Sequence, residues 1–396
     1  MRSYHHYYHN KVYRAIHSDF WRLEFSIWLE ALAWSLIAIF VPILMLRYGY
    51  SLVAVIVYNL VFYGIDVPLN FIARKGVLVW GARVVTVIGV ICAAIFSVTF
   101  HYLSLGGWSV LLGLAALQAL SDSFYWVGHF YLFIESSGKP EAAGRNTGIM
   151  NGVRILGGML GPAVGALIII LGGQNLLLFA SAIVYVLAIM PLFLLRHARN
   201  KPTSTMTFKE FLREPRERRD HLSIALYGIH ATADNPVWPI FIFVVLGTLN
   251  SVALLAVAVS VSTIILSYVT GIATRRNAAT LISVGSICAA AVWIVRFAIP
   301  NPVFYYASVL VLGFFSIMVS VPIESSVVAR GRVKDALWAS TIRNASSMLG
   351  PFFLFLILLP LVAVFKISFI VAALALFALI FITRWVGLDG KSALNG

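Results

Sequence analysis

Three acidic residues stand inside long apolar stretches of this sequence: Glu30, Asp122 and Asp234. A carboxyl group in a low-dielectric site that water can reach is able to take up and release protons near neutral pH. Each of the three is therefore a candidate for carrying protons, and we predict that at least one of them does so. The alternative is a hydrogen-bonded structural acid that never titrates.

Polar and aromatic side chains accompany these acids at the three- and four-residue spacing of one helix face. They are Trp34 after Glu30; Gln118, Tyr125 and His129 around Asp122; and Tyr227, His230 and Trp238 around Asp234. We predict that they line a solvated cavity that binds a small molecule. The two histidines could relay protons, because histidine titrates near neutrality, or could simply satisfy hydrogen bonds. The tryptophans could form an aromatic wall or belong to ordinary packing.

Long apolar runs must position these residues. The chain is 61% hydrophobic and 11% charged, and its mean hydropathy is +0.93. Runs of about 20 apolar residues indicate membrane-spanning helices, and the absence of strict alternation argues against a barrel. We expect an all-α polytopic membrane protein with twelve transmembrane helices, at 22–46, 51–72, 77–100, 108–134, 149–171, 176–195, 222–246, 251–271, 278–299, 303–324, 338–362 and 366–386.

The net charge of +14 follows the membrane topology. Most of the 29 Lys and Arg residues fall in alternate loops and at the two ends of the chain. Such a bias predicts that these loops and both termini are cytoplasmic, where anionic lipid headgroups are their partners. Nucleic acid is not expected as a partner. Arg47, Arg296 and Lys366 are the cations that this topology places near the outside.

Repeated sequence motifs divide the chain into two halves. "IESS" occurs at 134–137 and 323–326, and "MLGP" occurs at 159–162 and 348–351, at one constant offset. Long internal repeats of this kind are typical of transporters built from two similar bundles. We expect a cytoplasmic or interfacial segment at 1–21, six-helix bundles at 22–195 and 222–386, a basic cytoplasmic linker at 196–221 and a cytoplasmic tail at 387–396.

Two arginines stand inside predicted membrane helices, Arg154 and Arg343, again at the same offset. An arginine there costs about 2.5–3.5 kcal/mol on insertion scales, which makes a functional role the default hypothesis. We predict ion pairs that hold the two halves together in one state, with partners Asp66, Glu135 and Glu324. The alternative is that an arginine binds an anionic substrate.

These motifs resemble the major facilitator superfamily over nearly the whole chain. "GGMLGPAVGA", at 157–166, is similar to the fifth-helix GxxxGPxxGG motif of proton-coupled antiporters, with Gly157, Gly161, Pro162 and Gly165 in place and Ala166 departing from it. The resemblance implies that helices 1, 4, 7 and 10 line the cavity. It also implies that helices 5 and 11 pack across the boundary between halves, against helices 8 and 2. The motif of the loop between helices 2 and 3 is degraded around 69–76 and lacks its aspartate.

The resemblance and the three acids together predict a secondary active transporter that works by alternating access. We expect proton-coupled efflux by antiport of a small-molecule substrate; proton-coupled uptake of a metabolite, or a receptor or scaffold on the same fold, are the alternatives. No hydrolase, nucleotide-binding or zinc motif is found, so no enzyme, cofactor or metal site is expected, although His5, His6 and His9 could bind a metal. A monomer in a prokaryotic cytoplasmic membrane is expected.

Overall fold

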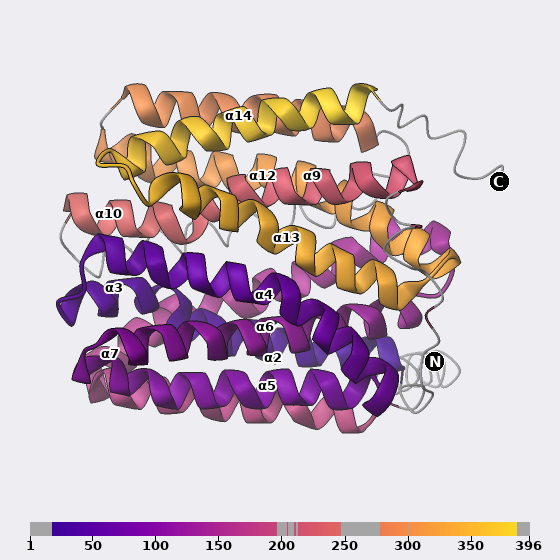
Figure 1. The fold of residues 1–396 in the computed structure, drawn as a ribbon, viewed down its shortest axis with the longest axis horizontal. Helices are drawn as coiled ribbons and strands as arrows, with labels where there is room; N and C mark the ends of the chain where they lie inside the picture. Colours follow the sequence, from indigo (N-terminus) through magenta and orange to yellow (C-terminus); the bar gives the residue numbers. More distant parts are fainter. Residues whose placement is uncertain are drawn as a thin grey trace, which may run out of the picture.

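A computed structural model describes residues 18–195, 204, 210, 213–246, 278–299 and 301–385. In these residues the chain is helical and contains no strand. Figure 1 shows two layers of long, nearly parallel helices: the first half of the chain, indigo to magenta, lies below the second half, orange to yellow. Residues 1–17 of the predicted N-terminal segment 1–21, the predicted tail at 387–396, most of the linker and the predicted span 251–271 lie outside the described residues. The first helix begins inside the predicted N-terminal segment, at Asp19.

The first half contains six apolar spans. The first span is α2 (Asp19–Ala38), which continues after Ile39 as α3 (Phe40–Arg47). It is followed by α4 (Leu52–Trp80), α5 (Ala82–Thr99) with the short turn η1 (Phe100–Leu105), and α6 (Trp108–Ser136). After the turn η2 (Pro140–Ala142), the predicted fifth and sixth spans form one element, α7 (Ala143–Phe193). Gly173, with φ 77°, bends the chain between these two spans, in a conformation that glycine adopts readily.

The second half repeats this architecture in its described part. Its first span is α9 (Pro215–Thr232), continued through η4 (Ala233–Val237) into α10 (Trp238–Leu246). The later spans are a helix at Ala278–Ala298, α12 (Pro302–Val333), α13 (Ala336–Leu358) and α14 (Val364–Trp385). Helix α9 begins seven residues before the predicted start at 222, so residues 215–221 belong to the bundle. Nine helices in the described chain are long and apolar enough to cross a membrane.

Short polar side chains begin several of these helices. Ser18, Ser51 and Asp335 accept hydrogen bonds from the backbone N–H groups three residues later, at 3.3, 3.2 and 2.8 Å. Asn301 does the same for Val303 at 2.9 Å. Each cap satisfies a donor that the first turn leaves without a partner, and typically stabilises a helix by about 1 kcal/mol.

The glycines of the "GGMLGP" motif let α7 approach α2 closely. A Cβ atom added at Gly157 would lie against the carbonyl oxygen of Trp28, and one added at Gly161 against the side chain of Ser35. The Ser35 hydroxyl donates to the Gly157 carbonyl at 3.4 Å. These glycines therefore pack within the first half, because α2 and α7 both belong to it. The predicted packing of helix 5 on helix 8 is not tested, since the span 251–271 lies outside the described residues.

The second half repeats this packing, with α13 against α9. A Cβ atom added at Gly350 would meet the Ala225 carbonyl, and one added at Gly228 would meet the Ser347 carbonyl at 2.9 Å. Helix 5 thus packs on helix 1, and helix 11 on helix 7, through the same small residues. This correspondence is the structural counterpart of the repeated "MLGP".

Across the boundary, α13 of the second half packs against α4 of the first half, as predicted for helices 11 and 2. The Tyr63 and Phe355 rings stack with centroids 5.7 Å apart. The ring of Phe352 lies against Gly64, 3.1 Å from the position that a Cβ atom would occupy. Aromatic contacts of this kind hold the two halves together beside the central cavity.

Candidate substrate cavity

Three predicted acids from three helices line one cavity of about 480 Å³ between the halves. Glu30 comes from α2, Asp122 from α6 and Asp234 from η4. The lining also includes predicted residues Trp34, Gln118, Tyr125 and Trp238, together with Trp126, Arg154 and Tyr185. A cavity of this size and composition is in the range that holds small-molecule ligands.

Not every predicted residue reaches this cavity. His129 is buried beside it and stacks on Tyr125, with ring centroids 5.1 Å apart. His230 is buried too, and it interacts through both ring nitrogens: Trp293 Nε1 donates to Nδ1 at 2.9 Å, and Ser316 Oγ lies 2.8 Å from Nε2. Among the described residues, neither histidine lines the cavity. The interpretation of His230 as a hydrogen-bonded core residue fits this arrangement better than a relay.

Helices α4, α6 and α13 meet in a buried polar network that includes Asp122. Asn344 of the second half donates to Asn70 Oδ1 at 2.8 Å and to Asp122 Oδ2 at 3.3 Å. Asn70 in turn donates to Asp66 Oδ1 at 2.6 Å. Asp66 was expected to pair with an arginine, but its side-chain partners among the described residues are Asn70 and Asp122. The network therefore links the two halves through amide groups at the depth of Asp122.

Asp234 is not an isolated acid, because Arg296 lies beside it. Arg296 Nη1 is 3.2 Å from Asp234 Oδ1, and Arg296 Nε donates to Ser308 Oγ at 2.8 Å. The guanidinium also lies over the rings of Trp238 and Trp293, 3.8 and 4.6 Å from their centroids. Arg296 was predicted to lie near the outside because it stands near the end of an apolar run; the structure adds that its side chain is buried in the bundle.

The two repeated arginines differ in their partners. Arg343 forms an ion pair with Glu324, and both residues belong to the second half. The link between halves at this point is instead Asn151, which donates to Glu324 Oε2 at 2.9 Å. Arg154 lies over the Trp126 ring, 5.6 Å from its centroid, and within the described chain it forms no ion pair. The expected Arg154–carboxylate pairs are thus not found there.

Glu135 pairs across the boundary with a residue that the sequence reasoning did not consider. Arg332 Nη1 lies 3.0 Å from Glu135 Oε2, and Arg332 Nε donates to the Gly138 carbonyl at 3.1 Å. These side chains are 31% and 47% exposed. Because exposed ion pairs contribute about 0–1 kcal/mol, this pair affects the relative position of the halves more than overall stability.

A second cavity of about 220 Å³ lies beside the first. It is lined by Tyr227, Glu324 and Arg343, and by Arg154, which lines both cavities. Tyr227 therefore belongs to this smaller cavity and does not face the three acids.

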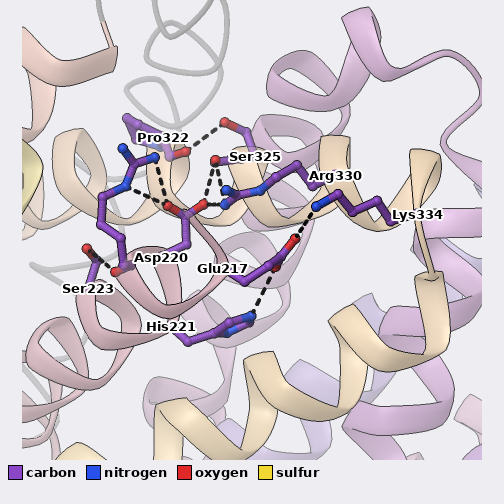
Figure 2. Close-up of polar contacts among 10 residues, drawn as sticks. Glu217, Asp220, His221, Ser223, Pro322, Ser325, Arg330 and Lys334 are labelled. Carbon is purple, nitrogen blue, oxygen red and sulfur yellow. Dashed lines mark hydrogen bonds and ion pairs between the residues drawn. The ribbon is translucent and has the colours of Figure 1, made fainter. Parts of the chain in front are cut away.

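A charged cluster that the sequence analysis did not identify joins the start of α9 to the end of α12 (Figure 2). Asp220 pairs with Arg330 and with Arg219, and accepts a hydrogen bond from Ser326 at 2.6 Å. The run of charges at 214–221 was the available signal, but it was assigned to a linker. The cluster holds the first turns of α9 against the end of α12, within the second half.

Glu217 extends this cluster toward His221 and Lys334, at 3.7 and 3.6 Å (Figure 2). Burial alone would raise the pKa of Glu217, but the hydrogen bond from His221 and the charges of Arg330 and Lys334 outweigh it. The pKa is therefore held below its ordinary value.

Comparison with known proteins identifies the family. The family model described as Major Facilitator Superfamily matches residues 23–351. The chain belongs to this superfamily. It is accordingly a secondary transporter and an integral membrane protein, and the predicted fold of two similar helical bundles is confirmed. No relative among curated proteins matches the sequence.

Solved structures of the superfamily share the fold. The human organic anion transporter MFSD10 (TETRAN) aligns with a TM-score of 0.68 and 11% identity, over 92% of this chain and 98% of that one. A variant of the E. coli fucose:proton symporter FucP has a TM-score of 0.68 and 12% identity, over 93% and 98%. FucP in the outward conformation gives 0.66 and 12%, over 93% and 99%.

Proposed function

We propose that this superfamily member couples proton movement to the transport of a small molecule, with Glu30, Asp122 and Asp234 as the proton-binding groups. The observation that carries the proposal is their position around one cavity between the two halves. Because alternating access exposes such a cavity to each side of the membrane in turn, a carboxyl group there can bind a proton on one side and release it on the other.

The three acids differ in their surroundings, which suggests a division of roles. Asp234 faces Arg296, so its charge is largely compensated. Asp122 accepts a hydrogen bond from Asn344 of the opposite half. Glu30 has no cation within ion-pair distance in the described chain and lies in the lining beside both Arg154 and Asp122. Glu30 is the first choice for the group that titrates during transport, and Asp122 is the second.

Efflux by antiport is the proposed direction, on the resemblance of "GGMLGPAVGA" to the antiporter motif. The glycines of this motif pack α7 on α2 within one half, so the motif supports the direction through family resemblance alone. Proton-coupled uptake is the second candidate, since a fucose:proton symporter is among the similar structures. The proposal also includes six-helix halves at 22–195 and 215–386, cytoplasmic termini, a monomeric state and a prokaryotic cytoplasmic membrane.

The test measures protons directly. Proteoliposomes loaded with the pH indicator pyranine are exposed to a panel of organic cations, anions and neutral compounds, at a fixed membrane potential. We expect at least one compound to cause a proton flux that is lost in Glu30→Gln or Asp122→Asn. Glu141→Gln, which removes a carboxyl group outside the cavity, serves as the matched control. Full compound-driven proton flux in a Glu30→Gln/Asp122→Asn double variant would refute the proposal.

A further inference from the structure

Three arginines lie within the membrane-spanning bundle, and two of them already have a carboxylate partner. Arg343 pairs with Glu324, and Arg296 pairs with Asp234. Arg154 differs, because in the described residues it forms no ion pair: its guanidinium lies over the ring of Trp126, at 5.6 Å, while Glu30 and Glu324 interact with its charge from beyond ion-pair distance. A guanidinium is always charged and offers five donors, so a site without an anion leaves most of its binding capacity unused.

The position of Arg154 is equally distinctive, since it contributes to the walls of both cavities. Its nearest acidic neighbour in the smaller cavity is not available to it. Glu324 is neutralised by Arg343 and accepts a hydrogen bond from Asn151 at 2.9 Å. The cation of Arg154 therefore faces open space at the junction of the two cavities, where a ligand can reach it.

The wall around this cation is aromatic. Trp126 and Trp34 line the larger cavity on the same half as Arg154, and Trp238 lines it from the other half. A ligand that fits must carry a planar or apolar body against these rings and a negatively charged group at Arg154. Charge-assisted, bidentate hydrogen bonds from arginine to a carboxylate are about twice as strong as neutral ones.

We propose that Arg154 is the recognition site for the anionic head group, a carboxylate or a phosphate, of an amphipathic aromatic substrate. This inference rests on the proposed function, because the carboxyl groups of Glu30 and Asp122 share the cavity and repel an anion unless they bind protons. A proton on Glu30 leaves Arg154 as the uncompensated charge of the wall that they share. Proton binding and anion binding then support each other, so this site fits the second candidate of the proposed function, proton-coupled uptake, rather than antiport, in which the two must compete.

The experiment uses four probes on the purified full-length protein. 2-Naphthoate, 2-naphthyl phosphate, 2-naphthamide and 2-naphthylmethylammonium share one aromatic body and differ in charge. Dissociation constants are measured for the wild type, Arg154→Gln, Arg154→Lys and Arg47→Gln. Arg47 is an exposed arginine at the end of α3, and its variant is the matched control.

We expect one or both anions to bind more tightly than the amide and the ammonium compound. Arg154→Gln should weaken this binding at least tenfold, which corresponds to about 1.4 kcal/mol. Arg154→Lys should retain part of the affinity, and Arg47→Gln should retain all of it. The anion that binds more tightly identifies the head group as a carboxylate or a phosphate.

Three results would overturn the inference: neither anion binds, the amide binds as tightly as the anions, or Arg154→Gln binds as the wild type does. If Arg154→Gln fails to fold, the affinities of the four probes for the wild type and for Arg154→Lys test the inference instead: equal binding of the amide and the anions to the wild type would overturn it. Failure of proton coupling is measured in a separate experiment, the proton-flux assay in proteoliposomes. Arg154-dependent anion binding without proton flux in proteoliposomes would support the site and refute the coupling, whereas proton flux driven only by cations would do the reverse.

Discussion

The Asp234–Arg296 pair allows a quantitative prediction of what one substitution costs. The Arg296 side chain is fully buried, whereas that of Asp234 is 20% exposed. Removing one partner of a buried ion pair typically costs about 3–5 kcal/mol, because the other charge remains without compensation. In Asp234→Asn the amide oxygen can still accept a hydrogen bond from Arg296, which recovers about 1 kcal/mol.

We therefore expect Asp234→Asn to lower the free energy of unfolding by about 2–4 kcal/mol. The rings of Trp238 and Trp293 limit this loss, since a desolvated cation–π contact contributes up to about 2 kcal/mol. Arg296→Met should cost less than Asp234→Asn, because the carboxylate left behind faces the cavity and can be hydrated. The double variant should be more stable than Asp234→Asn alone.

Unfolding by SDS in mixed micelles, followed by circular dichroism, measures these differences on the intact protein. Trp238→Phe provides a separate check on the aromatic contribution, because it weakens the contact over Arg296 without changing any charge. A loss below about 1 kcal/mol in Asp234→Asn, or strictly additive effects in the double variant, would show that the pair does not stabilise this half.

Three further predictions concern packing, pH and the boundary between halves. Gly157→Ala should lower stability by about 1–3 kcal/mol in the same unfolding assay, because its methyl group meets a backbone carbonyl, whereas Gly158→Ala, with open space around it, should not. Glu217→Gln should be less stable than the wild type at pH 7; since the pKa of Glu217 is lowered by folding, the difference should shrink as the pH falls below about 4.3 and the carboxyl group protonates. An equal difference at pH 3 and pH 7 would contradict this. Glu135→Gln should change stability by less than about 1 kcal/mol but increase labelling of a cysteine introduced at Ser340, which is buried against the Val127 carbonyl of the first half, as the halves separate more easily.

The sequence predicted the spans and the repeat because both depend on local composition. Long apolar runs must be helices in lipid, and the recurrence of "MLGP" required two similar bundles. Glu30, Asp122 and Asp234 were recognised as sharing a cavity from their depth in the spans and from the helices that carry them. These inferences need only the spacing along one helix and the order of helices in a known fold.

Side-chain partners could not be predicted in the same way. Arg343 pairs within its own half, and Glu135 pairs with Arg332, because contacts between helices depend on rotation about each helix axis, which apolar runs do not define. The burial of Arg296 was missed for a related reason: its distance from the end of a span does not show that two tryptophan rings and Asp234 enclose it. The residues at 215–221 were assigned to a linker because their charges hide the helix that they begin.

The two hydrogen bonds of Asn344 have a consequence for how this protein opens. The amide of Asn344 in one half serves Asn70 and Asp122 of the other; Asn344 and Asn70 are buried, whereas Asp122 also lines the cavity. If the halves part at this level, both acceptors lose their donor at once, and only water can take its place. Separation of the halves and replacement of the Asn344 donor by water at the Asp122 carboxylate are therefore a single event, which ties the surroundings of this acid to the opening of the boundary.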